Sequence, residues 1–392
     1  MRLNLKAVKG LILFILALPS YLAYAADEYQ IPKFNMHYGV TPLSKDIYFI
    51  HMTIFWICVG IGIVVFGAML IALMYHRKSR GVKAAQFHEN KTLEIFWAIV
   101  PFIILIAMAV PATIVLVRMN DYADSSLTIK ITGYQWKWKY DYLDEGIGYY
   151  SNLSTSLEQI NNKAPKNKWY LLEVDKPLVV PVNEKIRFVV TSNDVIHSWW
   201  VPALGIKRDA IPGFIHEAWA KIQKPGIYRG QCAELCGVNH GYMPIVVHAV
   251  TRPEFNKWVA SQRQEKQQTQ AAYKDKMDVA ELMKIGKSSY NKYCAACHQE
   301  NGMGIAPIYP ALRADSVAVG KPISRHIRIV LNGVPGSAMQ GFADQLTDVE
   351  LAAIITYERN AWGNHTGDVV QPIDIKKEKA ALTKKGDTTV NP

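Results

Sequence analysis

Two long stretches of the sequence contain no charged residue, and they restrict the possible folds more than any other feature. Residues 47–75 and 95–117 lack Lys, Arg, Asp and Glu entirely. Each stretch is longer than the roughly 20 apolar residues that a helix needs to cross the hydrocarbon core of a bilayer. We expect transmembrane helices at about 47–75 and 93–118, forming a hairpin within residues 26–120. Such a hairpin buries little of its own surface, which predicts a larger membrane partner.

The residues around these stretches set the orientation of the hairpin. The connection is basic and belongs on the cytoplasmic side; its cations are Arg77, Lys78, Arg80, Lys83 and Lys91. Residues 1–25 are typical of a secretory signal peptide, with a basic start, an apolar core at 11–18 and small residues before a cleavage site. That core is too short to span a bilayer. We therefore expect the mature N-terminus, and with it both ends of the hairpin, outside the cytoplasm.

Residues 121–251 have the pattern of a β-domain. Short β-rich runs are separated by Pro, Gly and Asn, which is typical of a sandwich or barrel. Residues 144–168 are rich in Gly, Ser and Asn and are predicted to form a surface excursion. The expected strand regions are 127–132, 169–182, 186–191, 214–222, 226–230 and 244–250.

The C-terminal third divides into three parts. Residues 252–278 are polar and Gln-rich, which predicts an exposed helix or semi-rigid linker. Residues 279–366 form a separate unit, with helices expected at 279–293 and at 348–360. The charged tail, 367–392, is predicted to be disordered. The net charge of +11 is spread along the chain without clusters of basic and aromatic residues, which argues against nucleic-acid binding.

Four potential ligands for a soft metal lie within twelve residues: Cys232, Cys236, His240 and Met243. Thiolate, imidazole and thioether together favour copper over magnesium, calcium or manganese. The alternative is a Cys232–Cys236 disulfide in an oxidising compartment, with the His and Met nearby by chance. His197, upstream in a strand-like stretch, adds a fifth candidate ligand and favours copper.

A second motif, Cys294-Ala-Ala-Cys297-His298, has the spacing of c-type haem attachment. The two thiols are placed to form thioethers to the vinyl groups, and the adjacent imidazole to ligate the iron. A thioredoxin-like dithiol or a zinc site is the alternative. No βαβ pattern flanks the motif, and no second Cys/His pair follows to complete a zinc shell.

The distal iron ligand is a choice between two methionines. Met303 follows His298 too closely to reach the opposite face of the porphyrin easily, whereas Met339 lies in a Gly-rich loop farther along the chain. We therefore favour Met339. A Met/His pair raises the haem potential, which suits electron transfer. A carbonyl within 306–312 is expected to accept the free ring N–H of His298.

The order of these parts resembles subunit II of cytochrome c oxidase with a fused C-terminal cytochrome c domain, as in the caa-type haem-copper oxidases of bacteria. The motifs that carry the resemblance are residues 133–138, 194–199, 209–213, 230–245 and the haem motif. It implies a multidomain fold: a two-helix transmembrane hairpin, a cupredoxin-like Greek-key β-barrel and an all-α class I cytochrome c domain. It also implies the inner membrane of a bacterium, with the two folded domains on the periplasmic face.

The resemblance further implies a dinuclear copper centre, CuA, in the β-domain. Cys232 and Cys236 would bridge both coppers, while His197 and His240 would each cap one. Met243 and the backbone carbonyl of Glu234 would be the weak ligands. The side chain of Glu234 would bind a magnesium ion shared with subunit I.

Two further residues match positions of functional interest in the family. Trp136 resembles the exposed aromatic through which electrons enter CuA; the alternative is packing within the barrel. Glu94 falls on a carboxylate at the mouth of a proton-uptake pathway; the alternative is a helix N-terminal carboxylate favoured by the helix dipole. The family often has an acidic pair before the copper histidine, and here it reads Asn193-Asp194.

The function implied is that of an electron relay in a proton-pumping terminal oxidase. Electrons from a soluble or membrane cytochrome c would reach the haem, pass to CuA and enter subunit I, where oxygen is reduced to water; subunit III is a further expected partner. His51 is the only histidine in the two predicted membrane helices, so neither helix offers a cluster of histidines. The oxygen chemistry is therefore expected in the partner subunit. The alternative is a stand-alone membrane-anchored di-metal electron carrier. A quinol oxidase homologue is disfavoured because that branch lacks the copper ligands.

Overall fold

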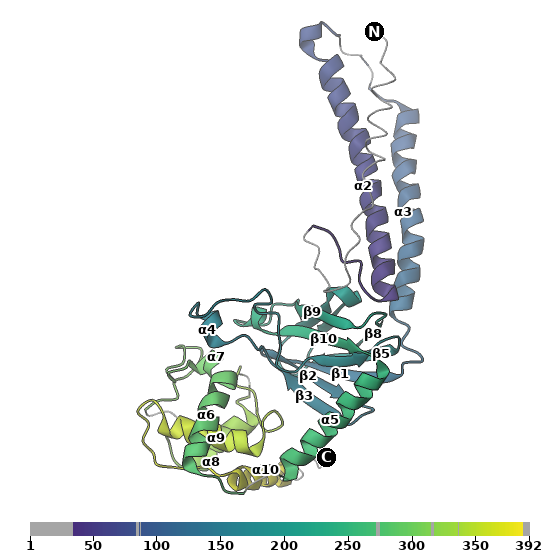
Figure 1. Ribbon diagram of the computed structural model, residues 1–392. Helices are drawn as coiled ribbons and strands as arrows, with labels where there is room; N and C mark the ends of the chain where they lie inside the picture. Colours follow the sequence, from purple (N-terminus) through teal and green to yellow (C-terminus); the bar gives the residue numbers. More distant parts are fainter. Residues whose placement is uncertain are drawn as a thin grey trace, which may run out of the picture.

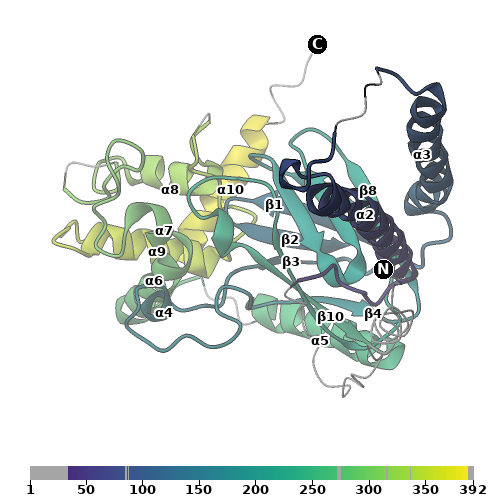
Figure 2. The same ribbon diagram turned by 90° about the horizontal axis from the view of Figure 1, so that it is seen from above.

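A computed structural model describes residues 34–83, 86, 88–271, 275–314, 317–335 and 337–386. Three bodies follow one another along the chain: a helical hairpin, a β-domain (residues 127–250) and a helical domain (residues 279–386) (Figure 1). Figures 1 and 2 both place the helical domain beside the β-domain and away from the hairpin. The predicted signal peptide, 1–25, lies outside the described residues.

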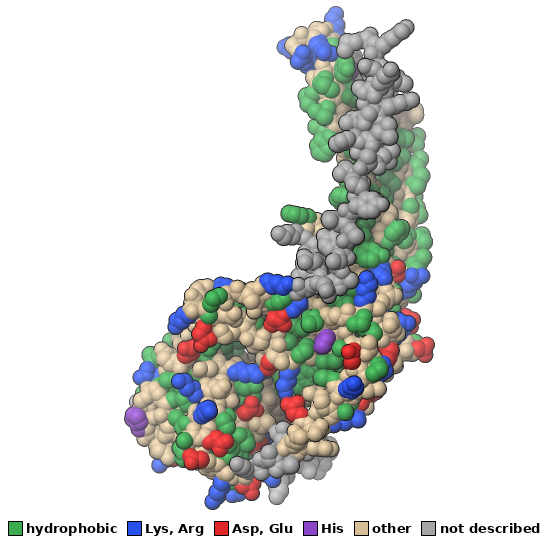
Figure 3. All heavy atoms as spheres, in the orientation of Figure 1, with side chains coloured by type: hydrophobic (Ala, Val, Ile, Leu, Met, Phe, Trp, Pro, Cys, Tyr) green, Lys and Arg blue, Asp and Glu red, His purple; other side chains and the backbone are tan. Residues whose placement is uncertain are grey.

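The hairpin consists of α2 (Pro42–Tyr75) and α3 (Lys91–Met119), with the short 3-10 helix η1 (Lys78–Arg80) after α2. Helix α2 begins earlier than its uncharged stretch because Thr41 and Ser44 form a capping box and Pro42 occupies the first turn. Both helices are long and apolar enough to cross a membrane. Many of their apolar side chains are exposed, and some are visible as green atoms along the hairpin (Figure 3).

The base of the hairpin is attached to the β-domain at both helices. The hydroxyl of Thr41 donates to the carbonyl of Leu204 at 2.9 Å. The indole of Trp219 donates to the carbonyl of Arg118, at the end of α3, at 2.9 Å. These contacts fix the folded domain directly at the membrane end of the helices.

The β-domain contains two five-stranded sheets, with strand orders β3-β2-β1-β5-β8 and β4-β10-β9-β6-β7. Strand β1 pairs parallel with β5, and β10 pairs parallel with β4, while the other ladders are antiparallel. This is the expected cupredoxin-like sandwich. The strands are β1 (Leu127–Tyr134), β2 (Lys137–Tyr142), β3 (Ile147–Ser151), β4 (Leu178–Pro181), β5 (Lys185–Ser192), β6 (His197–Val201), β7 (Ile206–Ala210), β8 (His216–Lys221), β9 (Gly226–Cys232) and β10 (Pro244–Val250). The short helices are α4 (Leu157–Ile160), η2 (Pro202–Leu204) and η3 (His240–Tyr242).

Large aromatic side chains fill the space between the sheets, among them the fully buried Trp138, Phe188 and Trp199. Two strand predictions need correction. Residues 144–168 are not wholly a surface excursion, because Ile147–Ser151 pairs with β2 as an edge strand. Within 169–182 only Leu178–Pro181 forms a strand.

The predicted linker begins with helix α5 (Arg252–Ala271), and one face of its first turns is buried. Phe255 and Val259 are buried in the core of the β-domain, and Trp258 packs against the rings of Tyr142 and Tyr149. These apolar residues are spaced at i, i+3 and i+4 but are confined to the start of the helix. The rest of the helix is polar and Gln-rich, so the composition of the whole segment did not predict this short apolar face.

The helical domain comprises α6 (Val279–Tyr293), α7 (Ala295–His298), α8 (Ile323–Asn332), α9 (Asp348–Asn360) and α10 (Pro372–Gly386). Helices α6 and α9 approach closely at Gly286, where an added Cβ would lie 2.2 Å from the Ala353 carbonyl oxygen. The prediction of a disordered tail over 367–392 was wrong for α10. Val370 and Ile375 are buried in the domain core, so this segment gains apolar contacts that its charged composition conceals.

Candidate metal centres

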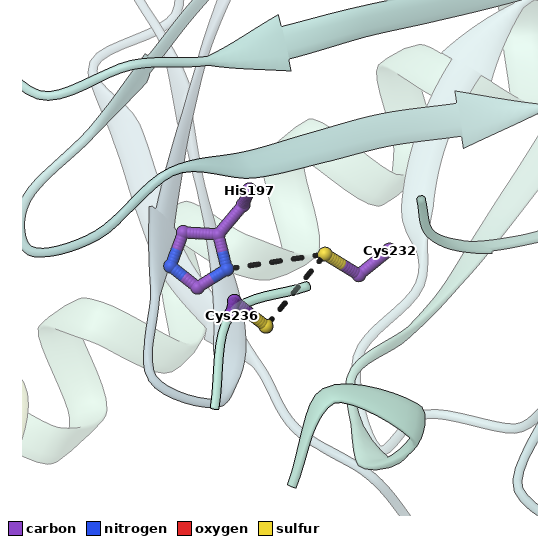
Figure 4. Close-up of side chains that lie close together, drawn as sticks. All are labelled: His197, Cys232 and Cys236. Carbon is purple, nitrogen blue, oxygen red and sulfur yellow. Dashed lines mark hydrogen bonds between the residues drawn. The ribbon is translucent and has the colours of Figure 1, made fainter. Parts of the chain in front are cut away.

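The predicted copper ligands come together at one end of the β-domain. His197 begins β6, Cys232 ends β9, His240 begins η3, and Met243 directly precedes β10. Neighbouring strand ends therefore bring residues from positions 197 to 243 to one place. Figure 4 shows His197, Cys232 and Cys236 pointing toward one another.

The ligand atoms are separated by contact distances. The two Sγ atoms are 3.9 Å apart, and His197 Nδ1 lies 3.9 Å from Cys232 Sγ. His240 Nδ1 and Met243 Sδ lie 3.4 and 3.5 Å from Cys236 Sγ. The Glu234 carbonyl oxygen is 3.4 Å from Cys232 Sγ. A disulfide requires about 2.05 Å between the sulfurs, so this geometry is that of separate thiols.

The two thiols affect each other's protonation. The hydrogen bond from the Cys236 thiol lowers the pKa of Cys232, helped by His197. The same bond, together with burial, raises the pKa of Cys236. Cys232 therefore loses its proton more readily than Cys236, and thiolate is the form that binds metals. Two sulfurs, two imidazoles and a thioether fit the donor set that copper prefers.

His197 is held by residues that the sequence did not single out as its supports. Its Nε2 lies 2.8 Å from Asp194 Oδ1, which leaves Nδ1 facing Cys232. Burial lowers the pKa of His197, but the hydrogen bonds to Asp194 and Cys232 outweigh it, so the pKa is raised. An added Cβ at Gly133 would lie 2.8 Å from the ring, so only glycine fits there. Gly133 and Asp194 both lie in motifs that carry the family resemblance, but the sequence did not show that they support His197.

Trp136 is half-buried, which differs from the exposed aromatic that the resemblance implied. Its indole N–H donates to the Cys236 carbonyl at 3.1 Å, and the Gln135 side-chain amide donates to the same oxygen at 2.8 Å. Gln135 and Trp136 thus both form hydrogen bonds to residues 232–243, the segment that carries four of the copper-ligand candidates and is called the ligand loop below. Trp138 is fully buried, and its ring contacts His197 edge-on, with the centroids 5.9 Å apart.

Glu94 and the side chain of Glu234 are both exposed. Glu94 lies in the first turn of α3, which Asn90 caps by accepting from the Leu93 amide at 3.1 Å. That turn is at the end of the hairpin distant from the β-domain (Figure 1). Proton uptake by Glu94 and magnesium binding by Glu234 stay predictions.

The haem motif lies at a cavity of about 990 Å³, the upper end of the roughly 300–1,000 Å³ typical of cofactor sites. Cys294, Cys297 and Met339 line it, and so do Trp136 and Lys137 of the β-domain. The cavity therefore lies between the two domains. It places the two candidate attachment sulfurs and the favoured distal methionine around one space of cofactor size.

The axial candidates occupy different environments. His298 is buried, and its Nδ1 donates to the Pro310 carbonyl at 2.9 Å, which confirms the predicted acceptor within 306–312. The Met339 carbonyl accepts from the Val334 amide at 2.8 Å, which ties the loop to the end of α8. Met303 is 55% exposed, and neither it nor His298 is among the residues that line the cavity. The geometry thus favours Met339 over Met303.

Comparisons with known families agree with this division of the chain. Residues 30–115 match the transmembrane domain of cytochrome c oxidase subunit II, and residues 127–250 match its periplasmic domain. Residues 281–357 match the family described as cytochrome c oxidase, cbb3-type, subunit III. The first two assignments imply a membrane-anchored protein with a periplasmic copper-binding domain, and the third implies haem binding by the helical domain.

Two curated subunit 2 sequences support the assignment. A probable cytochrome c oxidase subunit 2 of Rickettsia bellii is 38% identical over 259 residues, which are 66% of this chain and 92% of the relative. Cytochrome c oxidase subunit 2 of Cereibacter sphaeroides is 37% identical over 238 residues, covering 57% and 78%. The crystal structure of the periplasmic domain of subunit II from Bradyrhizobium japonicum is 41% identical, covering 37% of this chain and 98% of that chain, with a TM-score of 0.33. The chain belongs to the cytochrome c oxidase subunit II family and carries a cytochrome c-type domain after its periplasmic domain.

Proposed function

We propose that this chain is the electron-entry subunit of a proton-pumping terminal oxidase, in which a covalent haem c receives electrons and CuA transmits them to subunit I. The observation that carries the proposal is the placement of the two candidate centres. The cavity lined by Cys294, Cys297 and Met339 is also lined by Trp136, whose indole donates to the carbonyl of the ligand residue Cys236. A single side chain therefore connects the two sites.

The β-domain residues supply what a dinuclear copper centre needs. Cys232 and Cys236 lie side by side and can share two metals, with His197 and His240 on their outer sides. Met243 and the Glu234 carbonyl are placed as the weaker ligands. Copper bound here would accept and release one electron at a time. Both cysteine sulfurs belong to buried residues, which limits the access of water to them.

The helical domain supplies what a c-type haem needs. Cys294 and Cys297 would attach it covalently, and His298 would be its proximal ligand. The Pro310 carbonyl holds the imidazole so that Nε2 is free for the iron. Met339 would be the distal ligand. The haem would provide one-electron transfer, at a potential that the Met/His pair keeps high.

The hairpin supports a role within a larger membrane complex. Its side chains are apolar and mostly exposed along both helices, which provides a large surface for lipid and for subunits I and III. In this assembly Glu234 would bind magnesium at the boundary with subunit I, and Glu94 would serve proton uptake. The complex would lie in the inner membrane of a bacterium, with a cytochrome c as donor.

Isolation of the full chain from native membranes in mild detergent tests the proposal against a stand-alone electron carrier. We expect a larger haem-bearing membrane subunit to co-purify and the preparation to consume oxygen when reduced cytochrome c is added. Haem c and copper should both be present, with a mixed-valence copper EPR signal. A chain that carries both cofactors but isolates alone would contradict the oxidase assignment, and one without either cofactor would contradict the relay itself.

A further inference from the structure

The contacts between the two extramembrane domains suggest a function for Lys137. We infer that Lys137 is a positioning residue that holds the helical domain on the β-domain, with the Met339 loop against the segment that contains Trp136. The inference rests on the proposed function in that the contact it describes joins the two proposed cofactor sites. The fused domain itself would then occupy the Trp136 surface, and an external donor would deliver electrons to the helical domain.

The Met339 loop contacts the β-domain through its next residue. Gln340 Nε2 donates to the Gln135 carbonyl at 2.7 Å. The amide of Gln340 is itself oriented, because its Oε1 accepts from Gln345 Nε2 at 3.0 Å. The side chain of the same Gln135 donates to the Cys236 carbonyl. One residue of the β-domain is thus bonded both to the ligand loop and to the Met339 loop.

Lys137 lies at the centre of the same contact. It is 6% exposed, and its ammonium lies 5.0 Å from the ring of Phe342 and 5.9 Å from the ring of Tyr293, both in the helical domain. The ring of Tyr150, on β3, is 5.4 Å away. Burial lowers the pKa of Lys137 to about 8, so the ammonium remains charged at pH 7. A cation among aromatic rings within about 6 Å is attracted to them, most strongly where water is excluded.

This arrangement ties the burial of the Lys137 charge to the docking of the helical domain. Two of the three rings leave when the domains separate, and the ammonium then returns to water. A second cross-domain contact, the ion pair of Lys292 with Asp175 at 2.7 Å, lies closer to solvent, with side chains 40% and 23% exposed. Exposed pairs contribute little. The buried Lys137 contact is therefore the main polar determinant of docking next to Gln340.

Hydrogen–deuterium exchange of the full-length holoprotein in detergent tests the inference. Lys137→Met keeps the aliphatic stem and removes the charge, and Lys137→Arg restores a cation. Lys139→Met is the matched control, because Lys139 is on the same strand and contacts Tyr150 and Asp141 of the β-domain. We expect amides in 290–297 and 338–343 to exchange about tenfold faster in Lys137→Met, the equivalent of 1.4 kcal/mol in the docking equilibrium.

In Lys137→Arg and Lys139→Met, exchange of these segments should stay within about twofold of the wild type, and in all variants the copper EPR signal should be unchanged. Wild-type rates in Lys137→Met, or equal acceleration in Lys139→Met, would overturn the inference. So would a Lys137→Met variant in which the copper signal is lost, because Lys137 would then support the β-domain fold instead. Loss of the proposed function would appear differently, as missing haem or copper in the wild-type chain.

Discussion

The ligand loop of the β-domain and the haem motif of the helical domain are both short and sulfur-containing, yet they are constructed in opposite ways. At this site, the donor atoms of His197 and of the ligand loop form a chain of contacts at 3.4 to 3.9 Å. In the helical domain, Cys294, Cys297 and Met339 line the walls of a cavity of about 990 Å³. The copper-ligand site is thus defined by direct contacts between donor atoms that strand ends bring together. The haem site is defined by a cavity that several segments line.

This difference predicts how each site fails. Removing one donor from a contact cluster leaves its neighbours without a partner, so the cluster should lose its metal as a unit. Removing one wall residue from a cavity should leave the bound group in place with altered properties. The following substitutions test this contrast, from the largest expected effect to the smallest.

Cys232→Ser should abolish the mixed-valence copper EPR signal, because Cys232 is the residue that contacts Cys236, His197 and the Glu234 carbonyl at once. The haem absorbance should be unchanged. Cys58→Ser is the control, since Cys58 is a free thiol in α2. An unchanged copper signal in Cys232→Ser would contradict the copper assignment.

Met339→Ala should keep the haem attached and lower its reduction potential by on the order of 0.1 V, within the roughly 0.8 V range that axial ligands span. Redox titration of the haem absorbance measures the change. Met303→Ala is the matched control, because Met303 is exposed. A drop in potential in Met303→Ala with none in Met339→Ala would show that the distal ligand is misassigned.

Asp194→Asn should weaken copper binding by roughly 10- to 100-fold, the usual effect of removing the partner of a ligating imidazole. The carboxylate hydrogen bond raises the pKa of His197 and fixes its ring. Competition with a copper chelator measures the affinity. Asp141→Asn serves as the control, since Asp141 pairs with Lys139 on the same strand, and equal affinities in the two variants would exclude a supporting role for Asp194.

Gly286→Ala should destabilise the helical domain by about 1–3 kcal/mol, because the added methyl must displace the α9 backbone. The nearest atom, the Ala353 carbonyl oxygen, is 2.2 Å from the added Cβ. Thermal unfolding followed at the haem absorbance would show a lower Tm. Lys287→Ala, exposed on the same helix, should leave the Tm near that of wild type; a matching decrease in both variants would show that the crossing at Gly286 is not the cause.

Lys292→Ala should have the smallest effect, about 0–1 kcal/mol on docking of the two domains, because the ion pair with Asp175 is partly exposed. The effect should vanish in high salt, as surface electrostatics are screened there. Exchange rates of the interface amides at low and high salt measure it. An effect that exceeds that of Lys137→Met would reverse the proposed ranking of the interface contacts.

Much of the fold follows from local sequence pattern. The apolar stretches predicted both membrane helices, β-rich runs predicted β1 and β5, and the helix expected at 348–360 is α9, which Thr347 caps. The convergence of the copper-ligand candidates also followed, because Cys232, Cys236 and Met243 are close in sequence. These features depend on spacing along the chain, which a sequence displays directly.

The remaining features depend on surfaces that meet only in the folded chain. The burial of Ile375 in α10 requires the core of the helical domain, and the burial of Phe255 in α5 requires the open side of the sandwich. The contact of Gln340 with Gln135 joins residues 205 positions apart. Hydropathy and motif spacing do not indicate which distant residues pair in the folded chain. The predictions for the tail and the linker were therefore partly wrong, and the sequence predicted nothing about the interface between the two domains.

The central claim is that one chain holds both centres and passes electrons from one to the other. The most direct test is to inject a single electron photochemically into the oxidised full-length chain and follow the haem and copper absorbances together. We predict that the haem is reduced first and reoxidised as the copper band bleaches, with one shared rate constant that is independent of protein concentration. A rate that rises with protein concentration, or a haem that stays reduced while copper remains oxidised, would contradict the account.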